Sequence, residues 1–155
     1  MLRKQSTGDH RLAFYAQLAS MADLTMLKKK EQKAVEKAAR RAGFRFTQLE
    51  SADRHWEIIC ECHADVYRTI HAVLDRRQVA LKPLAQEESG QVLLGKNYRL
   101  QPVRVHTRAS LQAEIKTGLY MLLKQEEFPL RRCPHCKVGV FVAAGRRKYC
   151  SRTCT

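Results

Sequence analysis

The sequence contains no long hydrophobic stretch. No run of about 18 apolar residues occurs in its 155 residues, which excludes an ordinary transmembrane helix, and we expect no membrane partner. The first ten residues lack the apolar core of a secretory signal peptide, so we expect a cytoplasmic protein. No internal repeat or low-complexity tract is visible, and the apolar content of 45% is typical of a globular chain.

Acidic residues are also scarce. The chain has 15 Asp and Glu against 29 Lys and Arg, which sets the net charge at +14 and the pI near 9.9. The charge is uneven, with +6 over residues 1–50, −2 over 51–90, +3 over 91–130 and +7 over 131–155, where no acidic residue occurs. This distribution predicts a polyanionic partner.

Hydrophobic periodicity predicts a mostly helical N-terminal domain. Apolar residues recur at spacings of three and four, which predicts helices over 9–22, 24–42, 51–77 and 110–125. Gly43 is suited to end the second helix, and Ser51 or Asp53 can cap the third. The inward-facing residues that we expect are Leu12, Tyr15, Leu18, Met21, Leu24, Leu27, Ala34, Val35, Ala38, Ala42, Trp56, Ile59, His63, Val66, Ile70, Val73, Leu74, Leu111, Ile115, Leu119 and Leu122.

The predicted β structure is small. A hairpin is expected over 91–105, after a connector at 79–90, and Phe44-Arg45-Phe46 reads as a short strand or an anchored turn. We therefore predict a mainly α fold with a small β-hairpin region. A mostly helical domain over 1–128 precedes a C-terminal zinc module of treble-clef type over 129–155.

Four cysteines form the strongest motif of the chain. Cys133-x2-Cys136 is followed by thirteen residues and then by Cys150-x3-Cys154. Paired thiolates at these spacings supply the four ligands of a tetrahedral Zn²⁺ ion, and four protein ligands close the site as structural sites are closed. We predict one structural zinc ion. His135 is the alternative ligand, and disulfides are disfavoured without a secretory signal.

The segment between the two cysteine pairs suggests how the module folds. Residues 138–149 alternate around Ala143-Ala144-Gly145, which predicts a hairpin, and Ser151 is placed to cap one helical turn that carries Cys154. Phe141 and Tyr149 are its expected core, because about 25 residues cannot fold without the metal.

Two further cysteines lie in the third predicted helix. Residues two apart point to different sides of a helix, so Cys60 and Cys62 cannot chelate one ion together. We interpret Cys60 as a small buried residue and His63 as a histidine at the core edge. A second metal site using His55, Cys60 and His63 is the alternative.

The basic residues of two segments are the predicted nucleic-acid contacts. Arginine and lysine on a metal-held loop or a helix face are suited to phosphate backbones. The predicted contacts are Arg131, Arg132, Lys137, Arg146, Arg147, Lys148, Arg152, Lys29, Lys30, Lys33, Lys37, Arg40 and Arg41.

The C-terminal motif resembles the CGNR-type zinc finger of bacteria. The resemblance covers Leu130 to Phe141 and Arg146 to Cys154, including the four cysteines and the basic triplet before Tyr149. No Gly-Asn-Arg triplet follows Cys154. The resemblance implies a finger that closes a mostly helical domain, DNA binding and a part in stress-related transcription regulation.

The leading hypothesis is a zinc protein that binds DNA or RNA, either as a transcription regulator or as a small subunit of a nucleoprotein complex. Such a protein would be associated with the nucleoid or with other protein subunits. The alternative is a protein–protein adaptor in which zinc is only a structural staple. We do not expect an enzyme. A nuclease would need a base and a second metal site, and the candidate for these is the pair His71 and Asp75, four residues apart on the third predicted helix.

Overall fold

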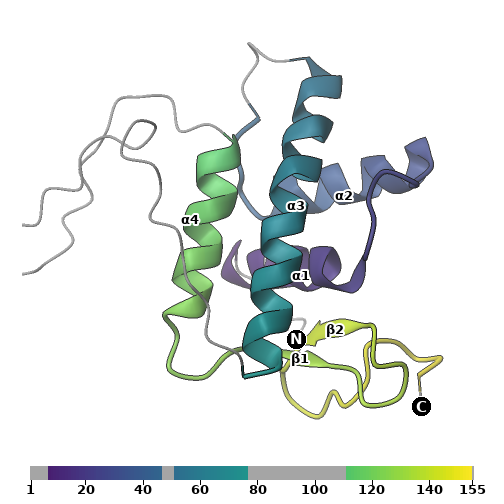
Figure 1. Ribbon diagram of the computed structural model, residues 1–155, viewed down its shortest axis with the longest axis vertical. Helices are drawn as coiled ribbons and strands as arrows, with labels where there is room; N and C mark the ends of the chain where they lie inside the picture. Colours follow the sequence, from purple (N-terminus) through teal and green to yellow (C-terminus); the bar gives the residue numbers. More distant parts are fainter. Residues whose placement is uncertain (1–6, 47–50, 77–110, 155) are drawn as a thin grey trace, which may run out of the picture.

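The computed structural model describes residues 7–46, 51–76 and 111–154. The expected connector at 79–90 and hairpin over 91–105 lie outside these residues. The described chain forms four helices and a two-stranded antiparallel sheet (Figure 1). The elements are α1 (Thr7–Ser20), α2 (Lys29–Arg41), α3 (Ala52–Leu74), α4 (Leu111–Leu123), β1 (Leu130–Arg132) and β2 (Val140–Val142). The prediction of a mainly α fold is confirmed for this part of the chain.

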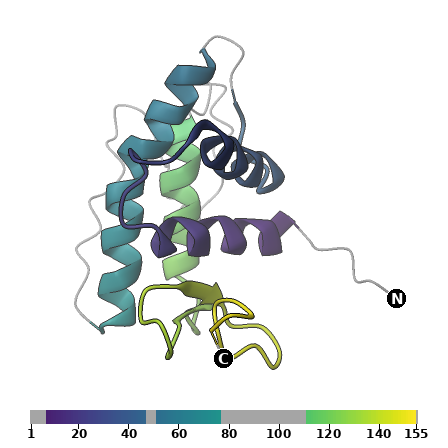
Figure 2. The ribbon, with the colours of Figure 1, turned by 90° about the vertical axis from the view of Figure 1, so that its right-hand side faces the viewer.

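Helix α1 lies at the centre of the fold. It packs against α2, α3 and β2, while α3 packs along α4. Figures 1 and 2 both show α1 between α2 on one side and the small sheet on the other. None of the helices in the described ranges is long and apolar enough to cross a membrane.

An aromatic cluster fills the core between α1 and the end of α2. The ring centroids of Phe14 and Phe44 are 5.3 Å apart, and Tyr15 lies edge-on to Phe44 at 6.1 Å. Gly43 makes this possible, because its φ of 82° ends α2 and turns the chain back so that Phe44 is buried. Residues 44–46 thus form no strand, and Arg40 lies 3.9 Å over the ring of Phe46.

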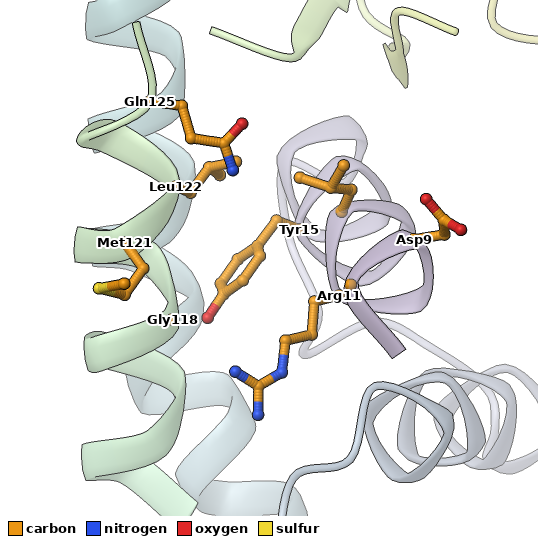
Figure 3. Close-up of a pocket in the computed structure, with 9 residues that line it drawn as sticks. Asp9, Arg11, Tyr15, Gly118, Met121, Leu122 and Gln125 are labelled. Carbon is orange, nitrogen blue, oxygen red and sulfur yellow. The ribbon is translucent and has the colours of Figure 1, made fainter. Parts of the chain in front are cut away.

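Tyr15 joins α1 to α4 at a point of close approach. Its hydroxyl donates a 2.6 Å hydrogen bond to the carbonyl of Ile115, and its ring lies against Gly118, where any side chain would collide with it (Figure 3). Burial raises the pKa of Tyr15, so the phenol stays protonated and remains a donor. A shallow groove of about 280 Å³ runs along this contact.

Helix α2 begins later than its apolar pattern predicts. The predicted start at Leu24 is wrong, because Asp23 accepts the amide of Thr25 at 2.8 Å in a turn that precedes the helix. The carboxylate of Glu31 accepts the amide of Lys28 at 2.8 Å and so satisfies a free donor at the true start. Ala34, predicted to face inward, is exposed, and Ala39 is buried in its place.

Helix α3 begins at the predicted cap and buries most of the predicted stripe. The hydroxyl of Ser51 accepts the amide of Arg54 at 3.2 Å. Ile59, Val66 and Ile70 are buried as predicted, but Trp56, Val73 and Leu74 are only half-buried. The stripe is wider than the sequence suggested because α3 packs on α1 and on α4 at once, which also buries the residues Ile58, Cys62 and Thr69.

Two histidines of α3 cap the C-terminal end of α1. Nε2 of His63 lies 3.1 Å from the carbonyl oxygen of Leu18, and Nε2 of His71 lies 2.7 Å from that of Ala19. Carbonyl oxygens only accept hydrogen bonds, so both Nε2 atoms carry a proton here. The last carbonyls of a helix have no partner within it, and these two side chains satisfy them. His63 is buried at the core edge, as predicted.

Candidate metal centre and basic surfaces

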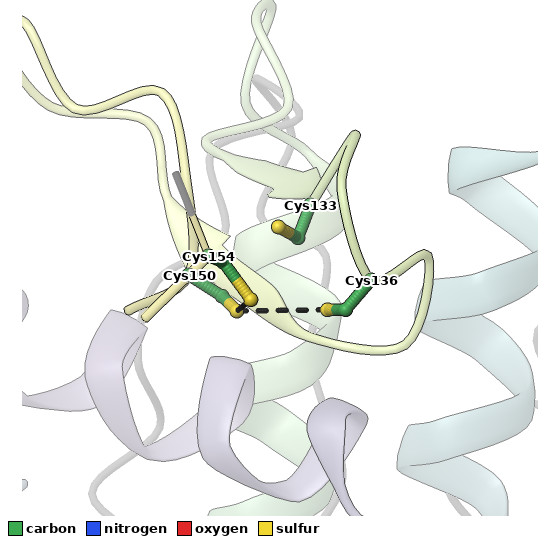
Figure 4. Close-up of side chains that lie close together, drawn as sticks. All are labelled: Cys133, Cys136, Cys150 and Cys154. Atoms are coloured by element: carbon green, nitrogen blue, oxygen red, sulfur yellow. Dashed lines mark hydrogen bonds between the residues drawn. The ribbon is translucent and has the colours of Figure 1, made fainter. Parts of the chain in front are cut away.

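The four C-terminal cysteines lie together. Their sulfur atoms are all within 4.8 Å of one another, although the two pairs are separated by thirteen residues (Figure 4). Cys150 Sγ lies 3.7 Å from Cys136 Sγ and 3.5 Å from Cys154 Sγ. All four cysteines are free thiols. Their arrangement can hold a metal ion.

The spacing of the sulfurs fits a tetrahedral ion. A Zn–S bond of about 2.3 Å implies edges of roughly 3.8 Å between the sulfurs of a tetrahedral site. Two of the sulfur–sulfur distances, 3.5 and 3.7 Å, lie just below that value, and all of them are within 4.8 Å. His135 is exposed and lies outside the ligand set, so the four thiols close the site by themselves.

The environment of the thiols differs from one to the next. Burial opposes ionisation of Cys133, but backbone amides of Cys136, Cys150 and His135 outweigh it and lower the pKa of this thiol to about 6. Amides of Gly139 and Val138 lower the pKa of Cys136. The neighbouring thiol of Cys154, followed by burial, raises the pKa of Cys150 to about 12. Cys133 and Cys136 are thus set up to ionise before Cys150.

The first cysteine pair lies in the turn between β1 and β2. The strands pair in antiparallel register with Arg132 opposite Val140, and the amide of Cys133 donates to the carbonyl of Gly139 at 2.7 Å. The amide of Gly139 points at Cys136 Sγ, 3.2 Å away. This turn therefore brings the sulfurs of Cys133 and Cys136 close together and directs one backbone N–H group at Cys136 Sγ.

The predicted hairpin over 138–149 is wrong. Val140–Val142 pairs with Leu130–Arg132 instead, and residues 143–149 form no strand. The chain turns away after β2, where Gly145 takes a φ of 59°, so the second half of the segment leaves the sheet. The pairing of β2 with β1 places Leu130 and Val140 in one buried cluster with the residues of the helical core.

The predicted helical turn after Cys150 is also wrong. The amide of Cys154 makes one turn-type bond to the carbonyl of Ser151 at 3.3 Å, and no helix follows within the described residues. The Ser151 hydroxyl lies 2.9 Å from that of Thr153, and within the described residues its contacts are to side chains and not to a backbone amide. The prediction of a treble clef is therefore not supported by its two expected elements.

Arg147 fastens the second cysteine pair. Its guanidinium donates to the carbonyl of Tyr149 at 3.1 Å and to that of Cys150, and it lies 5.5 Å over the ring of Phe141. Phe141 is buried as predicted, whereas Tyr149 is only half-buried. Arg147 was also predicted to contact nucleic acid, and it stays exposed while its guanidinium bonds these two carbonyls.

Arg132 is the second predicted contact that the fold uses internally. It donates to Asp75 at 2.7 Å and lies 2.8 Å from Nδ1 of His71, both at the end of α3. The bridge ties β1 to α3, and Leu130 and Val140 belong to the same buried cluster as the helices. The sheet thus packs on the helical part across the predicted boundary at residue 128.

The other predicted contacts are on the surface. Their residue exposures place them all in solvent, and none makes an ion pair within the described residues. They are Arg131, Lys137, Arg146, Lys148 and Arg152 around the cysteines and Lys29, Lys30, Lys33, Lys37, Arg40 and Arg41 on α2.

Cys62, and not Cys60 as predicted, is the buried cysteine of α3. Cys62 is buried and Cys60 is half-buried, because the side of α3 that carries Cys62 faces the core. Burial raises the pKa of Cys62 to about 12, so its thiol stays protonated. Among the described residues, the C-terminal cysteines are the only group of three or more metal-binding side chains at ligand distance, so the alternative site with His55 and His63 does not form.

Comparison with known proteins finds no matching family model, no matching curated protein and no matching solved structure. The resemblance to the CGNR-type finger therefore depends only on the cysteine motif and its neighbouring residues. Function has to be argued from the site and its surface.

Proposed function

We propose that this chain is a zinc protein that binds nucleic acid through phosphate contacts. The observation that carries the proposal is the charge around the cysteines: residues 129–154 hold seven cations and no carboxylate. Zinc bound by four thiolates contributes about −2, which leaves this module strongly positive. Zinc would hold the cations in place, so little conformational entropy would be lost on binding.

Zinc is the metal that the ligand set favours. Four thiolates at tetrahedral spacing are typical of structural zinc, and no position is left open for catalysis at such a site. When bound, the ion would join the turn between β1 and β2 to the segment that carries Cys150 and Cys154. Native mass spectrometry with and without chelator tests this directly, and the expected result is one zinc per chain.

Helix α2 is the second proposed contact surface. At 3.6 residues per turn, its six cations fall within an arc of about 120°. Val35 and Ala39, which are buried, lie on the opposite side of the helix. The cations in this arc, which we call the α2 basic face, are Lys29, Lys30, Lys33, Lys37, Arg40 and Arg41.

The two surfaces lie on opposite sides of α1, so they can be tested separately (Figure 2). One variant replaces Lys29, Lys33 and Lys37 by Gln, and a second replaces Arg146 and Lys148. Arg68→Gln, which removes an exposed cation of α3, is the matched control. Phosphate contacts are expected to make log K fall with log salt by about 0.9 for each contact. Each surface variant should weaken binding and flatten this slope.

The proposal fails if affinity for both DNA and RNA is the same between about 50 and 200 mM salt. Nuclease-resistant capture of a single acidic protein would instead support the adaptor, in which the same cations face carboxylates. The resemblance to a DNA-binding finger favours nucleic acid, either in a transcription regulator or in a nucleoprotein complex. The proposal includes no catalytic step, since His71 and Asp75 both contact Arg132.

A further inference from the structure

A hollow lies beside the second cysteine pair. Its volume is about 410 Å³, and its walls are Arg147, Lys148, Tyr149, Ser151 and Arg152. Cys150 lies in the middle of this run of residues, and Cys154 lies two residues beyond its last member, Arg152. A bound metal would therefore fix the backbone that forms the walls. The hollow is within the size range of small-ligand sites, which is about 300–1,000 Å³.

The positive charge of the hollow favours an anionic ligand. Three of its five walls are cations, and no carboxylate occurs between Pro129 and Cys154. Lys148 and Arg152 are exposed and make no ion pair with any described residue. Arg147 is held by two backbone carbonyls and by Phe141, so it contributes a positive charge at a fixed place.

Tyr149 adds an aromatic wall to these cations. Its side chain is half-buried, and no other ring of the described residues stacks on it. A phosphate alone needs no aromatic wall and would leave most of the volume empty. Cations beside an unpaired ring are the combination by which proteins hold single-stranded nucleic acid, with bases stacked on the ring and phosphates on the cations.

We propose that this hollow holds one nucleotide of a single-stranded nucleic acid, with the phosphate at Lys148 and Arg152 and the base on Tyr149. The inference depends on the proposed function and makes it more specific. Bases in a duplex are stacked on one another and cannot reach such a ring, so single strands should bind better than duplexes.

The test uses the zinc-loaded full chain and four probes: a single-stranded DNA oligonucleotide, its RNA counterpart, the matching duplex and a nucleoside monophosphate. Tyr149→Leu should reduce affinity for the single strands by about 5- to 100-fold, the range that loss of one stacked base produces. Duplex binding should change little. Tyr149→Phe keeps the ring and should bind like the wild type.

Matched variants separate the hollow from the general charge. The double variant Lys148→Gln with Arg152→Gln removes two cations that make no hydrogen bond within the described residues. Arg131→Gln with Lys137→Gln removes two exposed cations of the same module outside the hollow. The first pair should weaken single-strand binding at least tenfold more than the second. This comparison between the two double variants also tests the proposal if Tyr149→Leu fails to retain zinc.

Three outcomes would overturn the inference. One is that the zinc-loaded Lys148 and Arg152 double variant binds single strands as tightly as the Arg131 and Lys137 control. Another is that the duplex binds more tightly than either strand, and the third is that the free monophosphate binds as tightly as the oligonucleotides. If only the α2 variant loses binding and the Lys148 and Arg152 variant does not, the hollow is not a binding site, but the proposed function still stands. No binding to any nucleic acid at low salt would remove both proposals.

Discussion

Ser20 and Val140 are 120 residues apart in sequence and bonded to each other. The amide of Val140 donates to the Ser20 hydroxyl at 2.8 Å, and the same hydroxyl lies 3.0 Å from the Val140 carbonyl. In the β1–β2 ladder, Cys133 and Gly139 are a hydrogen-bonded pair, so the next residue, Val140, points both backbone groups away from β1. The last turn of α1 meets them there, which connects the helices to the cysteine turn.

Ser20→Ala should destabilise the protein by about 1–3 kcal/mol, because it leaves the half-buried amide of Val140 without an acceptor. Urea denaturation of the zinc-loaded protein measures this change. Thr153→Ala is the control, since the exposed Thr153 hydroxyl bonds another exposed side chain, that of Ser151, at 2.9 Å. Equal midpoints for Ser20→Ala and the wild type would mean that the bond contributes nothing.

Gly139→Ala should release the metal. A methyl group at this position would lie 2.5 Å from Cys150 Sγ and 2.6 Å from its Cβ, which is closer than atoms can approach. Gly145→Ala is the matched control, because its added methyl meets no atom within 4 Å and only the φ of 59° opposes it, at about 1–2 kcal/mol. Chelator competition should show weak zinc binding for the first variant and near-normal binding for the second.

Arg147→Ala and Arg146→Ala should differ, although both remove one positive charge. Arg147 holds the carbonyls of Tyr149 and Cys150, so its loss should speed zinc release at least several-fold. Arg146 is exposed, and its loss should leave release unchanged. Arg147→Lys should not restore the wild-type rate, because an ammonium group cannot span both carbonyls and cover a ring. The rate is read from transfer of zinc to a coloured chelator.

Gly118→Ala should destabilise the protein although alanine is the better helix former. The propensity gain is about 1 kcal/mol, but the new methyl would collide with the buried ring of Tyr15, and overpacking of this kind costs about 1–3 kcal/mol. Tyr15→Phe alone should also destabilise, through loss of the bond to Ile115. The double variant should be more stable than the sum of the single losses, as a double-mutant cycle can show.

Zinc affinity should fall as the pH falls, with a slope that steepens in acid. Cys150, with a pKa raised to about 12, binds a proton throughout the neutral range, so zinc must displace that proton at every pH tested. Cys133, with a pKa lowered to about 6, competes only below that value. Each competing thiol adds about tenfold per pH unit. Chelator competition between pH 8 and 5 measures the slope, and a constant slope would contradict the ordering of these thiols.

Much of the helical part could be predicted because its signals are local. Gly43 ends α2 and Ser51 caps α3 by rules that involve only a few neighbouring residues. The residues that were misplaced depend on distant partners. Ala39 is buried in place of Ala34, and Cys62 in place of Cys60, according to which side of each helix the others pack against.

The cysteine cluster could also be predicted, because two closely spaced cysteine pairs in one short segment are typical of a single metal site. The strand pairing could not. The alternation from Val138 to Tyr149 is typical of a local hairpin. In the structure, β2 pairs with Leu130–Arg132 instead, and Ser20 of α1 bonds Val140 on the other edge of β2.

The sequence alone determined the candidate ligands, the charge and the approximate positions of the helices, because spacing, composition and periodicity are properties of neighbouring residues. Only the tertiary structure decided which cations remain available. Arg132 and Arg147 look like their basic neighbours in the sequence, yet one is bound to Asp75 and the other to two backbone carbonyls. The fold decides which cations are held by internal partners and which extend into solvent, and for Arg132 that partner lies 57 residues away in the chain.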